Sequence, residues 1–341
     1  MRCIRPIKAG FNSQGDIVYS SSKMSLELGT FEFECRKCLP CRLNMAREKA
    51  IRCVHEASCH EDNIFVTLTY SDENLVSDKL VYRDWQLFAK RLRERRIRKF
   101  EKFVNRRATK DEKEALYIPY MVTGEYGDRG KRPHWHAIVF NYRPGDSRLE
   151  RHTDHGEKVF SSRELGPYMA DEVNECSEWD EKPLWTKGKV EFGSVTMDSA
   201  GYVARYAAKK LVHGQDQDHD YHPIHKVSQR RAIGRSWIEK YWKFTFENGF
   251  CLLPNKEKCK IPRYYVDWLK KNKWEEYVKY VNGAQKKAIE FGEKKRRKEE
   301  LEFFGELANH RTGRPYPLKR QDYEIKCLER KFERLMEEMK L

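Results

Sequence analysis

The sequence contains no long hydrophobic run. No stretch approaches the roughly 20 apolar residues of a membrane-spanning helix. The chain begins Met-Arg-Cys-Ile-Arg-Pro, with no apolar run of the length of a signal peptide. Also absent are an internal repeat and a Gly-x4-Gly-Lys-Ser/Thr run, the loop that holds nucleotide phosphates in P-loop motors. We therefore expect no membrane partner and no built-in nucleoside-triphosphate motor.

A disulfide framework is not expected either. The 341 residues include ten cysteines. Without an export signal, they indicate free thiols or metal ligands in a reducing cytoplasm. A chain of this length can form one large domain or two modest ones, each with a buried core.

Positive charge is what the chain has in excess. It has 68 Lys and Arg against 53 Asp and Glu, a net charge of +15. This surplus favours polyanionic partners, nucleic acid first and an anionic membrane surface second, with solvated helices as the competing explanation. Aromatic residues make up 13% of the chain, which argues against a disordered basic tail.

Composition divides the chain into three predicted parts. They are a Cys-rich N-terminal segment (1–60), a core (61–214) and a basic, aromatic and helical C-terminal region (215–341).

Three cysteines of the N-terminal segment, Cys35, Cys38 and Cys41, are separated by two-residue gaps. Such gaps let a tight turn direct consecutive sulfurs at one ion. Zinc takes four ligands in structural sites, and Cys3 is the first candidate for the fourth. The spacing predicts a structural Zn²⁺ site, and three free thiols in a turn are the alternative.

Apolar periodicity predicts the regular elements. Apolar runs and alternation predict strands at 63–70, 118–123, 134–140 and 189–195. Helical periodicity predicts helices at 44–56, 80–103, 200–211, 284–307 and 320–340. The remaining segments are read as a charged linker (106–114), a long insertion or active-site loop (141–187) and a His/Asp-rich link (215–225).

A Gly-rich, charged turn separates the strands at 118–123 and 134–140, which favours an antiparallel hairpin. His134 and His136 lie two residues apart on a strand, so their side chains share a face. The hairpin can bring Glu125 opposite both histidines. Two imidazoles and one carboxylate with open positions form a facial site for a divalent metal ion. Histidines that merely pack in a strand are the competing interpretation.

Two tyrosines, Tyr202 and Tyr206, lie four residues apart on the predicted helix at 200–211 and therefore share a face. Three cations lie on the same helix: Arg205, Lys209 and Lys210. Ordinary packing at the edge of a core is the alternative explanation for such a tyrosine pair.

Together these features suggest one reaction. A hard divalent ion such as Mg²⁺ or Mn²⁺ polarises a backbone phosphate of DNA. A tyrosine hydroxyl attacks the phosphorus and displaces the 3′ oxygen, which leaves a 5′-phosphotyrosine. The phenol has a reference pKa of about 10, so it needs the metal or the cations Arg205, Lys209 or Lys210 to ionise.

Basic residues alternate with aromatic ones after residue 230, with Arg231 and Arg235 close to Trp237. Single-stranded nucleic acid is bound by such a mixture, because cations contact phosphates and rings stack on bases. Packing accounts for the rings equally well. Arg132 and Arg205 are further candidate nucleic-acid contacts.

Three motifs in this order resemble those of the His-hydrophobic-His (HUH) endonucleases. They are Phe-Val-Thr-Leu-Thr-Tyr at 65–70, Arg-Pro-His-Trp-His at 132–136 and the segment with both tyrosines at 202–210. The tyrosines follow the histidines, as in replication initiators, whereas in the similar plasmid-mobilising relaxases the tyrosine precedes them. The chain looks most like the initiators of the gokushovirus-type microviruses, small single-stranded-DNA bacteriophages. The cysteine turn and residues 232–237 extend the resemblance over about residues 1–280.

The resemblance implies an α+β fold, with an antiparallel sheet of about five strands flanked by helices (HUH endonuclease or RRM-like). It also implies rolling-circle replication in the host bacterial cytoplasm: nicking of the viral plus-strand origin, extension with host helicase and DNA polymerase, and religation of a circle. A non-catalytic DNA-binding protein with a zinc knot is the main alternative. A metal hydrolase of another class fits less well, because Ala-Ile-Val rather than an Asp-His pair follows the histidines.

Overall fold

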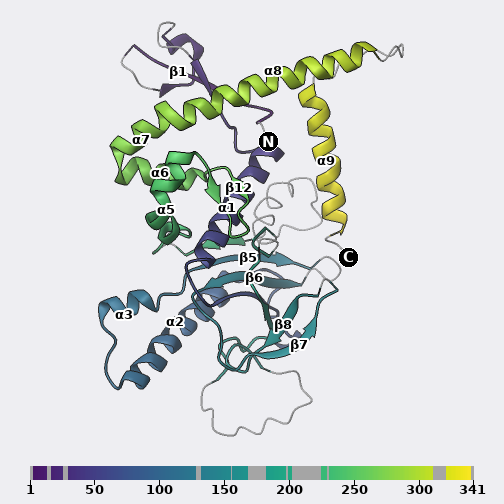
Figure 1. Cartoon of the computed structure of the whole chain (residues 1–341). Helices are drawn as coiled ribbons and strands as arrows, with labels where there is room; N and C mark the ends of the chain where they lie inside the picture. Colours follow the sequence, from purple (N-terminus) through teal and green to yellow (C-terminus); the bar gives the residue numbers. More distant parts are fainter. Residues whose placement is uncertain are drawn as a thin grey trace. The chain divides into compact units, whose positions relative to one another are not determined.

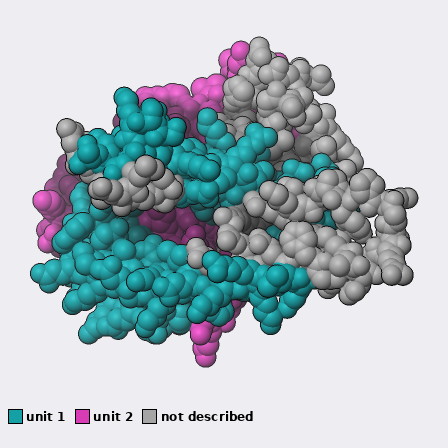
Figure 2. All heavy atoms as spheres, turned by 90° about the horizontal axis from the view of Figure 1, so that it is seen from above, with its two compact units in different colours: residues 1–45, 243–250, 266–341 teal, residues 46–242, 251–265 magenta. Residues whose placement is uncertain are grey.

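The computed structural model describes residues 3–13, 17–25, 30–127, 132–154, 156–167, 182–196, 199–201, 224–228, 230–309 and 320–338. They form antiparallel sheets flanked by helices, which confirms the predicted α+β class (Figure 1). Figure 2 colours two compact units teal and magenta. Unit 1 comprises Met1–Met45, Lys243–Phe250 and Val266–Leu341, and unit 2 comprises Ala46–Trp242 and Cys251–Tyr265. The predicted boundaries at residues 60 and 214 stay a prediction.

The main sheet lies in unit 2 and has the strand order β10-β5-β6-β4-β9-β8-β7, antiparallel throughout. Its strands are β4 (Asn63–Leu68), β5 (Tyr120–Tyr126), β6 (Pro133–Phe140), β7 (Arg148–His152), β8 (Lys158–Ser161), β9 (Val190–Gly193) and β10 (Ile224–Val227). The four predicted strands correspond to β4, β5, β6 and β9. Their alternating side chains fill a core on both faces of the sheet, which is why the pattern was visible in the sequence.

Three further strands lie where no strand was predicted. The segment 141–187 contains the hairpin β7–β8, so it is not merely a loop, and β10 follows the His/Asp-rich link. All five residues of β7 are exposed, and β10 pairs with β5 alone among the described strands. Strands at an edge bury few apolar side chains, so their sequences carry little alternation.

One face of the sheet packs on helix α2 (Tyr82–Val104). Trp85, Phe88 and Leu92 of this helix form a buried cluster with Val66 and Trp135 of the sheet. The predicted helix at 80–103 is confirmed. The supposed linker at 106–114 was wrong in part, because α3 (Lys110–Ala115) forms there behind a capping box made by Thr109 and Glu112.

The opposite face packs on helix α1 (Leu39–Ala57). Ala46, Ala50 and Cys53 of α1 form a second buried cluster with Met121 and Ile138 of the sheet. Small side chains on the helix let its backbone approach the strands closely. This face is therefore apolar where α1 covers it and carries polar side chains further along β5 and β6.

The rest of the chain forms a small sheet, short hairpins and helices. The order β2-β1-β3 combines β1 (Ile7–Phe11), β2 (Ile17–Val18) and β3 (Thr30–Phe33), and β11 (Cys251–Leu252) pairs with β12 (Lys258–Cys259). The helices are η1 (Ser21–Lys23), η2 (Asp72–Asn74), α5 (Arg235–Asn248), α6 (Arg263–Asn272), α7 (Trp274–Tyr280), a π-helical turn (Val281–Gln285), α8 (Lys286–Asn309) and α9 (Arg320–Glu338). The helices predicted at 284–307 and 320–340 correspond to α8 and α9. Among the described residues, no helix combines the length and apolarity that a bilayer crossing requires.

Candidate active site

The β5–β6 hairpin forms with the register that the metal-site hypothesis requires. Glu125 pairs directly with His134, and Thr123 pairs with His136. Nε2 of His134 lies 3.1 Å from Oε1 of Glu125, and Nε2 of His136 lies 2.8 Å from the same oxygen. One potential ligand atom from each of the three residues lies within 4.8 Å of the other two. The expected convergence of one carboxylate and two imidazoles is confirmed.

Burial and hydrogen bonding set the charges of these groups. Only 5% of Glu125 and 9% of His136 is exposed. Burial of Glu125 opposes its ionisation, but hydrogen bonds from His134 and His136 outweigh it and lower the pKa of the carboxyl to about 2. Burial lowers the pKa of His136. At neutral pH the pair is therefore a carboxylate and a neutral imidazole, the protonation states that bind a metal ion.

The tautomer of His134 points to a cation at this position. Its Nδ1 lies 3.1 Å from the backbone carbonyl oxygen of Arg132, which can only accept, so Nδ1 carries a proton. In the neutral ring, Nε2 is then an acceptor directed at the Glu125 carboxylate. Two acceptors face each other favourably only with a cation between them, either a proton or a metal ion. Imidazole and carboxylate donors together suit a divalent ion that keeps open positions.

Thr67 of β4 orients the second histidine. Its Oγ1 lies 2.9 Å from Nδ1 of His136, and the ring of Phe65 stacks on His136 with centroids 5.7 Å apart. This leaves Nε2 of His136 directed at Glu125. Sequence reasoning placed Thr67 in a strand but missed this role, for which the only signal was its position in the first motif.

We expect Thr67→Val to lower the affinity for Mn²⁺ by about 10–100-fold, because partners that orient ligand histidines contribute on this scale. The change is nearly isosteric and removes the hydroxyl at His136. Titration calorimetry with Mn²⁺ measures it. Thr69→Val is the matched control, since the Thr69 hydroxyl donates to the carbonyl of Lys189. Equal affinities of the two variants would refute the positioning role.

The other face of the sheet holds the histidine strand in place. Trp135, between the two histidines, is fully buried and donates from Nε1 to Oη of Tyr70 at 3.0 Å. Tyr70 in turn donates to Asp84 of α2 at 3.0 Å. Gly124 lies against the Trp135 ring, where an added Cβ would be 2.6 Å from a ring carbon. This close packing favours glycine beside the metal site.

The helix with the candidate nucleophiles begins on the face of the sheet that carries the histidines. Residues 199–201 are helical, and Thr196 and Ser199 exchange side-chain hydrogen bonds with each other's backbone N–H groups at 3.1 and 2.8 Å. Ala200 is fully buried in the cluster that contains Ile138 and Phe140, which alternate with the residues of the opposite face along β6. Five predicted site residues lie outside the described part of the chain: Tyr202, Arg205, Tyr206, Lys209 and Lys210.

The described candidate DNA contacts are partly engaged within the protein. Arg132 donates to the carbonyl of Tyr70 at 2.8 Å and forms an ion pair with Asp72. Arg235 is exposed and pairs with Glu239 at 2.7 Å. Arg231 is partly exposed. The geometry does not bring Arg231 or Arg235 to the metal site.

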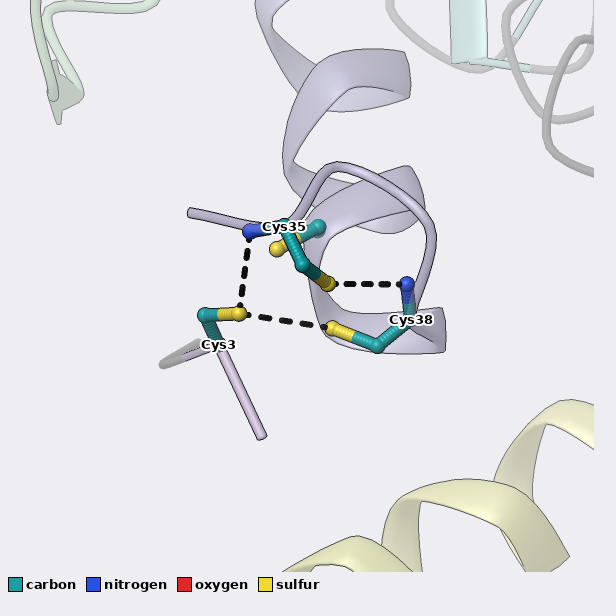
Figure 3. A group of neighbouring side chains, drawn as sticks. Cys3, Cys35 and Cys38 are labelled. Atoms are coloured by element: carbon teal, nitrogen blue, oxygen red, sulfur yellow. Dashed lines mark hydrogen bonds between the residues drawn. The ribbon is translucent and has the colours of Figure 1, made fainter. Parts of the chain in front are cut away.

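The four predicted zinc ligands converge in unit 1. Sγ atoms of Cys3, Cys35, Cys38 and Cys41 all lie within 4.8 Å of one another. Figure 3 shows Cys3 facing Cys35 and Cys38, and the sulfurs of Cys3 and Cys38 are 3.9 Å apart. Sulfurs around a tetrahedral zinc are separated by about 3.8 Å, given Zn–S bonds of about 2.3 Å. The nine cysteines that the structure describes are free thiols.

Backbone N–H groups polarise this cluster. The N–H of Cys35 donates to Sγ of Cys3 at 3.2 Å, and the N–H of Cys38 donates to Sγ of Cys35 at 3.3 Å. Burial opposes ionisation of Cys35, but the N–H groups of Cys38 and Lys37 outweigh it and lower its pKa to about 6. Burial raises the pKa of Cys3 and Cys41. A bound cation would hold all four sulfurs as thiolates, the form in which cysteine ligates metals.

Comparisons with known proteins agree in one respect, replication. A family model for replication-associated proteins of the ORF2 type matches residues 63–211. The chain is 52% identical over 341 residues to replication-associated protein VP4 of Bdellovibrio phage phiMH2K, with 100% of both chains covered. It is 29% identical over 273 residues to replication-associated protein ORF4 of Chlamydia phage 1, which covers 76% of this chain and 60% of the relative. For replication-associated protein ORF2 of Spiroplasma virus 4, identity is 26% over 312 residues, or 84% of this chain and 86% of the relative. No solved structure matches.

Proposed function

Because the chain belongs to the family of phage replication-associated proteins, we propose that it starts rolling-circle replication by cutting single-stranded DNA at the viral plus-strand origin. The cut stores the broken bond as a 5′-phosphotyrosine, and the same chemistry in reverse closes the product circle. The protein is then a metal-dependent tyrosine endonuclease and strand transferase of the HUH class.

The convergence of Glu125, His134 and His136 is the observation that carries this proposal. The three side chains lie on the sheet face where the helix that leads to Tyr202 begins. When bound between them, Mg²⁺ or Mn²⁺ supplies Lewis-acid polarisation of the scissile phosphate. Thr67 and the carbonyl of Arg132 keep the two imidazoles turned toward the carboxylate.

In the proposed reaction, Oη of a tyrosine attacks the phosphorus. A tyrosyl–phosphate bond forms, the bond from phosphorus to the 3′ oxygen breaks, and the released oxygen takes up a proton as a 3′-hydroxyl. The phenol loses its own proton, which the nearby positive charge of Arg205, Lys209 and Lys210 favours by lowering its pKa. Two tyrosines, Tyr202 and Tyr206, permit one to hold a DNA end while the other cuts again.

Partners follow from this reaction. The freed 3′-hydroxyl is a primer for the host DNA polymerase, and a host helicase separates the strands, because the sequence has no P-loop of its own. The site of action is then the host bacterial cytoplasm, where the viral DNA replicates. Arg132, Arg205, Arg231 and Arg235 are the proposed contacts to the DNA backbone.

The full chain is tested with a single-stranded oligonucleotide from the phage plus-strand origin and Mg²⁺ or Mn²⁺. We expect a covalent protein–DNA adduct that persists in denaturing electrophoresis. EDTA, His134→Ala and the double change Tyr202→Phe with Tyr206→Phe should each abolish it. Tyr241→Phe, at an exposed tyrosine of α5, is the control and should form the adduct normally.

The outcomes separate the alternatives. An adduct that persists in the double tyrosine variant contradicts the assignment of the nucleophiles. DNA binding with no adduct under any metal condition favours the non-catalytic DNA-binding protein.

We also propose that Cys3, Cys35, Cys38 and Cys41 bind one structural Zn²⁺. The separation of the sulfurs and the N–H groups directed at them support a tetrahedral thiolate site. Such a site would stabilise the start of α1, since Cys41 lies in its first turn. With all four positions filled by protein, this ion has no open position and takes no part in the reaction.

A further inference from the structure

A cavity of about 220 Å³ lies in unit 2, between α1 and the β10 edge of the sheet. It is lined by Lys49, Arg52, Cys53, Met121, His225, Lys226, Val227 and Ile233. Pockets for drug-sized ligands measure about 300–1,000 Å³. The cavity therefore has room for one small group such as a single nucleobase.

The cavity lies on the same sheet face as the metal site. His225 of β10 pairs with Thr123 of β5, which pairs with His136 of β6. Residues in one such row point to the same face. His225 and His136 are two strands apart, a separation of about 10 Å. A DNA strand bound at the metal site can therefore reach the cavity with a neighbouring nucleotide.

The lining combines cations with an apolar wall. Lys49 and Arg52 of α1 and Lys226 of β10 supply positive charge, while Met121 and Ile233 are almost fully buried and form part of the wall. A methionine thioether packs favourably on aromatic rings. Cations beside an apolar recess are the chemistry that binds a nucleotide, with charge for the phosphate and a surface for the base.

Arg52 is held in a fixed position. Its Nε donates to the carbonyl of Ile233 at 2.9 Å, and its guanidinium lies 4.1 Å from the centre of the Tyr264 ring. The side chain therefore contributes a fixed positive charge and helps to shape the cavity. Lys226 is exposed and Lys49 partly exposed, so these two are placed to reach a phosphate outside.

We propose that this cavity is a subsite for one nucleotide of the single-stranded DNA, next to the nucleotide that is cut. Its base enters against Met121 and Ile233, and its phosphate contacts Lys49 and Lys226. The inference rests on the proposed function for the identity of the strand, but it concerns binding alone and needs neither metal nor cleavage.

The first test removes the charge at the rim. In EDTA, the double change Lys49→Gln with Lys226→Gln should weaken binding of the labelled plus-strand origin oligonucleotide by about tenfold or more. Lys110→Gln with Lys113→Gln is the control, because it removes two exposed lysines from α3 of the same unit. An equal loss of affinity in both variants would overturn the proposal.

The second test locates the base. A series of oligonucleotides with one abasic position each should reveal a position near the cut where loss of the base weakens binding to the native chain by about tenfold. In Val227→Phe the added ring fills the cavity from a position that is 41% exposed, so that dependence should disappear. An unchanged abasic profile in this variant contradicts the subsite.

These outcomes are distinct from those of the adduct assay. An adduct with no rim or cavity effect refutes the subsite and leaves the endonuclease proposal intact. A rim and cavity effect with no adduct does the reverse. Competition by a free mononucleotide as effective as the oligonucleotide would assign the cavity to a free nucleotide and overturn the strand subsite.

Discussion

Replacing Glu125 with glutamine should lower Mn²⁺ affinity by more than about 100-fold, because changes to residues that only orient ligands already cost about 10–100-fold. The substitution keeps the shape of the side chain but removes its negative charge. In the native chain the pKa of this carboxyl is lowered to about 2, so the charge is present throughout the neutral range. Adduct formation at limiting metal should decrease in proportion.

Glu191→Gln is the matched control for this change. Glu191 pairs with Thr67 in the same row of the sheet as His136, and it forms ion pairs with Lys189 and Arg151. It should lose no metal affinity. Circular dichroism establishes that both variants fold. Unchanged Mn²⁺ affinity in a folded Glu125→Gln protein would remove this carboxylate from the metal site.

A chain with Cys38→Ser should contain no zinc, whereas the native chain should contain about one ion per molecule. Metal-dependent folding contributes about 10–16 kcal/mol in zinc-finger peptides, so the loss should be visible well beyond the cluster. We expect faster hydrogen exchange at residues 3–13 and 30–41 and earlier thermal unfolding. Elemental analysis and exchange mass spectrometry measure both effects.

Cys59→Ser is the control for the zinc site. Cys59 is a partly buried free thiol outside the cluster, and its sulfur donates to the carbonyl of His55, a bond that a serine hydroxyl can also make. Zinc content and exchange should remain native. Stoichiometric zinc in Cys38→Ser would show that the ion is bound elsewhere.

The metal hairpin could be predicted from the sequence because local rules determine it. His134 and His136 had to share a face of their strand, and a short turn limits the register to a few choices. Glu125 indeed lies directly opposite His134. The convergence of Cys3 with the cysteine turn is different, since two distant segments meet there and only the number of ligands that zinc requires indicated it.

Other parts escaped prediction for identifiable physical reasons. Helix α3 is Lys-Asp-Glu-Lys-Glu-Ala, which has no apolar stripe, and only the capping box around Thr109 revealed it. Strand β7 has no buried residue, so hydrophobic alternation could not mark it. His225 of the basic cavity was read as part of a link, because its strand becomes recognisable only when it pairs with β5.

All three side chains of the metal site come from a single hairpin, between Glu125 and His136. Closing so short a loop costs little chain entropy, since the cost rises with the logarithm of loop length. The hairpin therefore needs no distant segment to assemble its ligands, and the tyrosine helix is a separate contribution. A gene rearrangement that moved the tyrosine segment ahead of the hairpin would leave the ligand set intact. This independence gives a physical reason why similar endonucleases occur with either order of the two motifs.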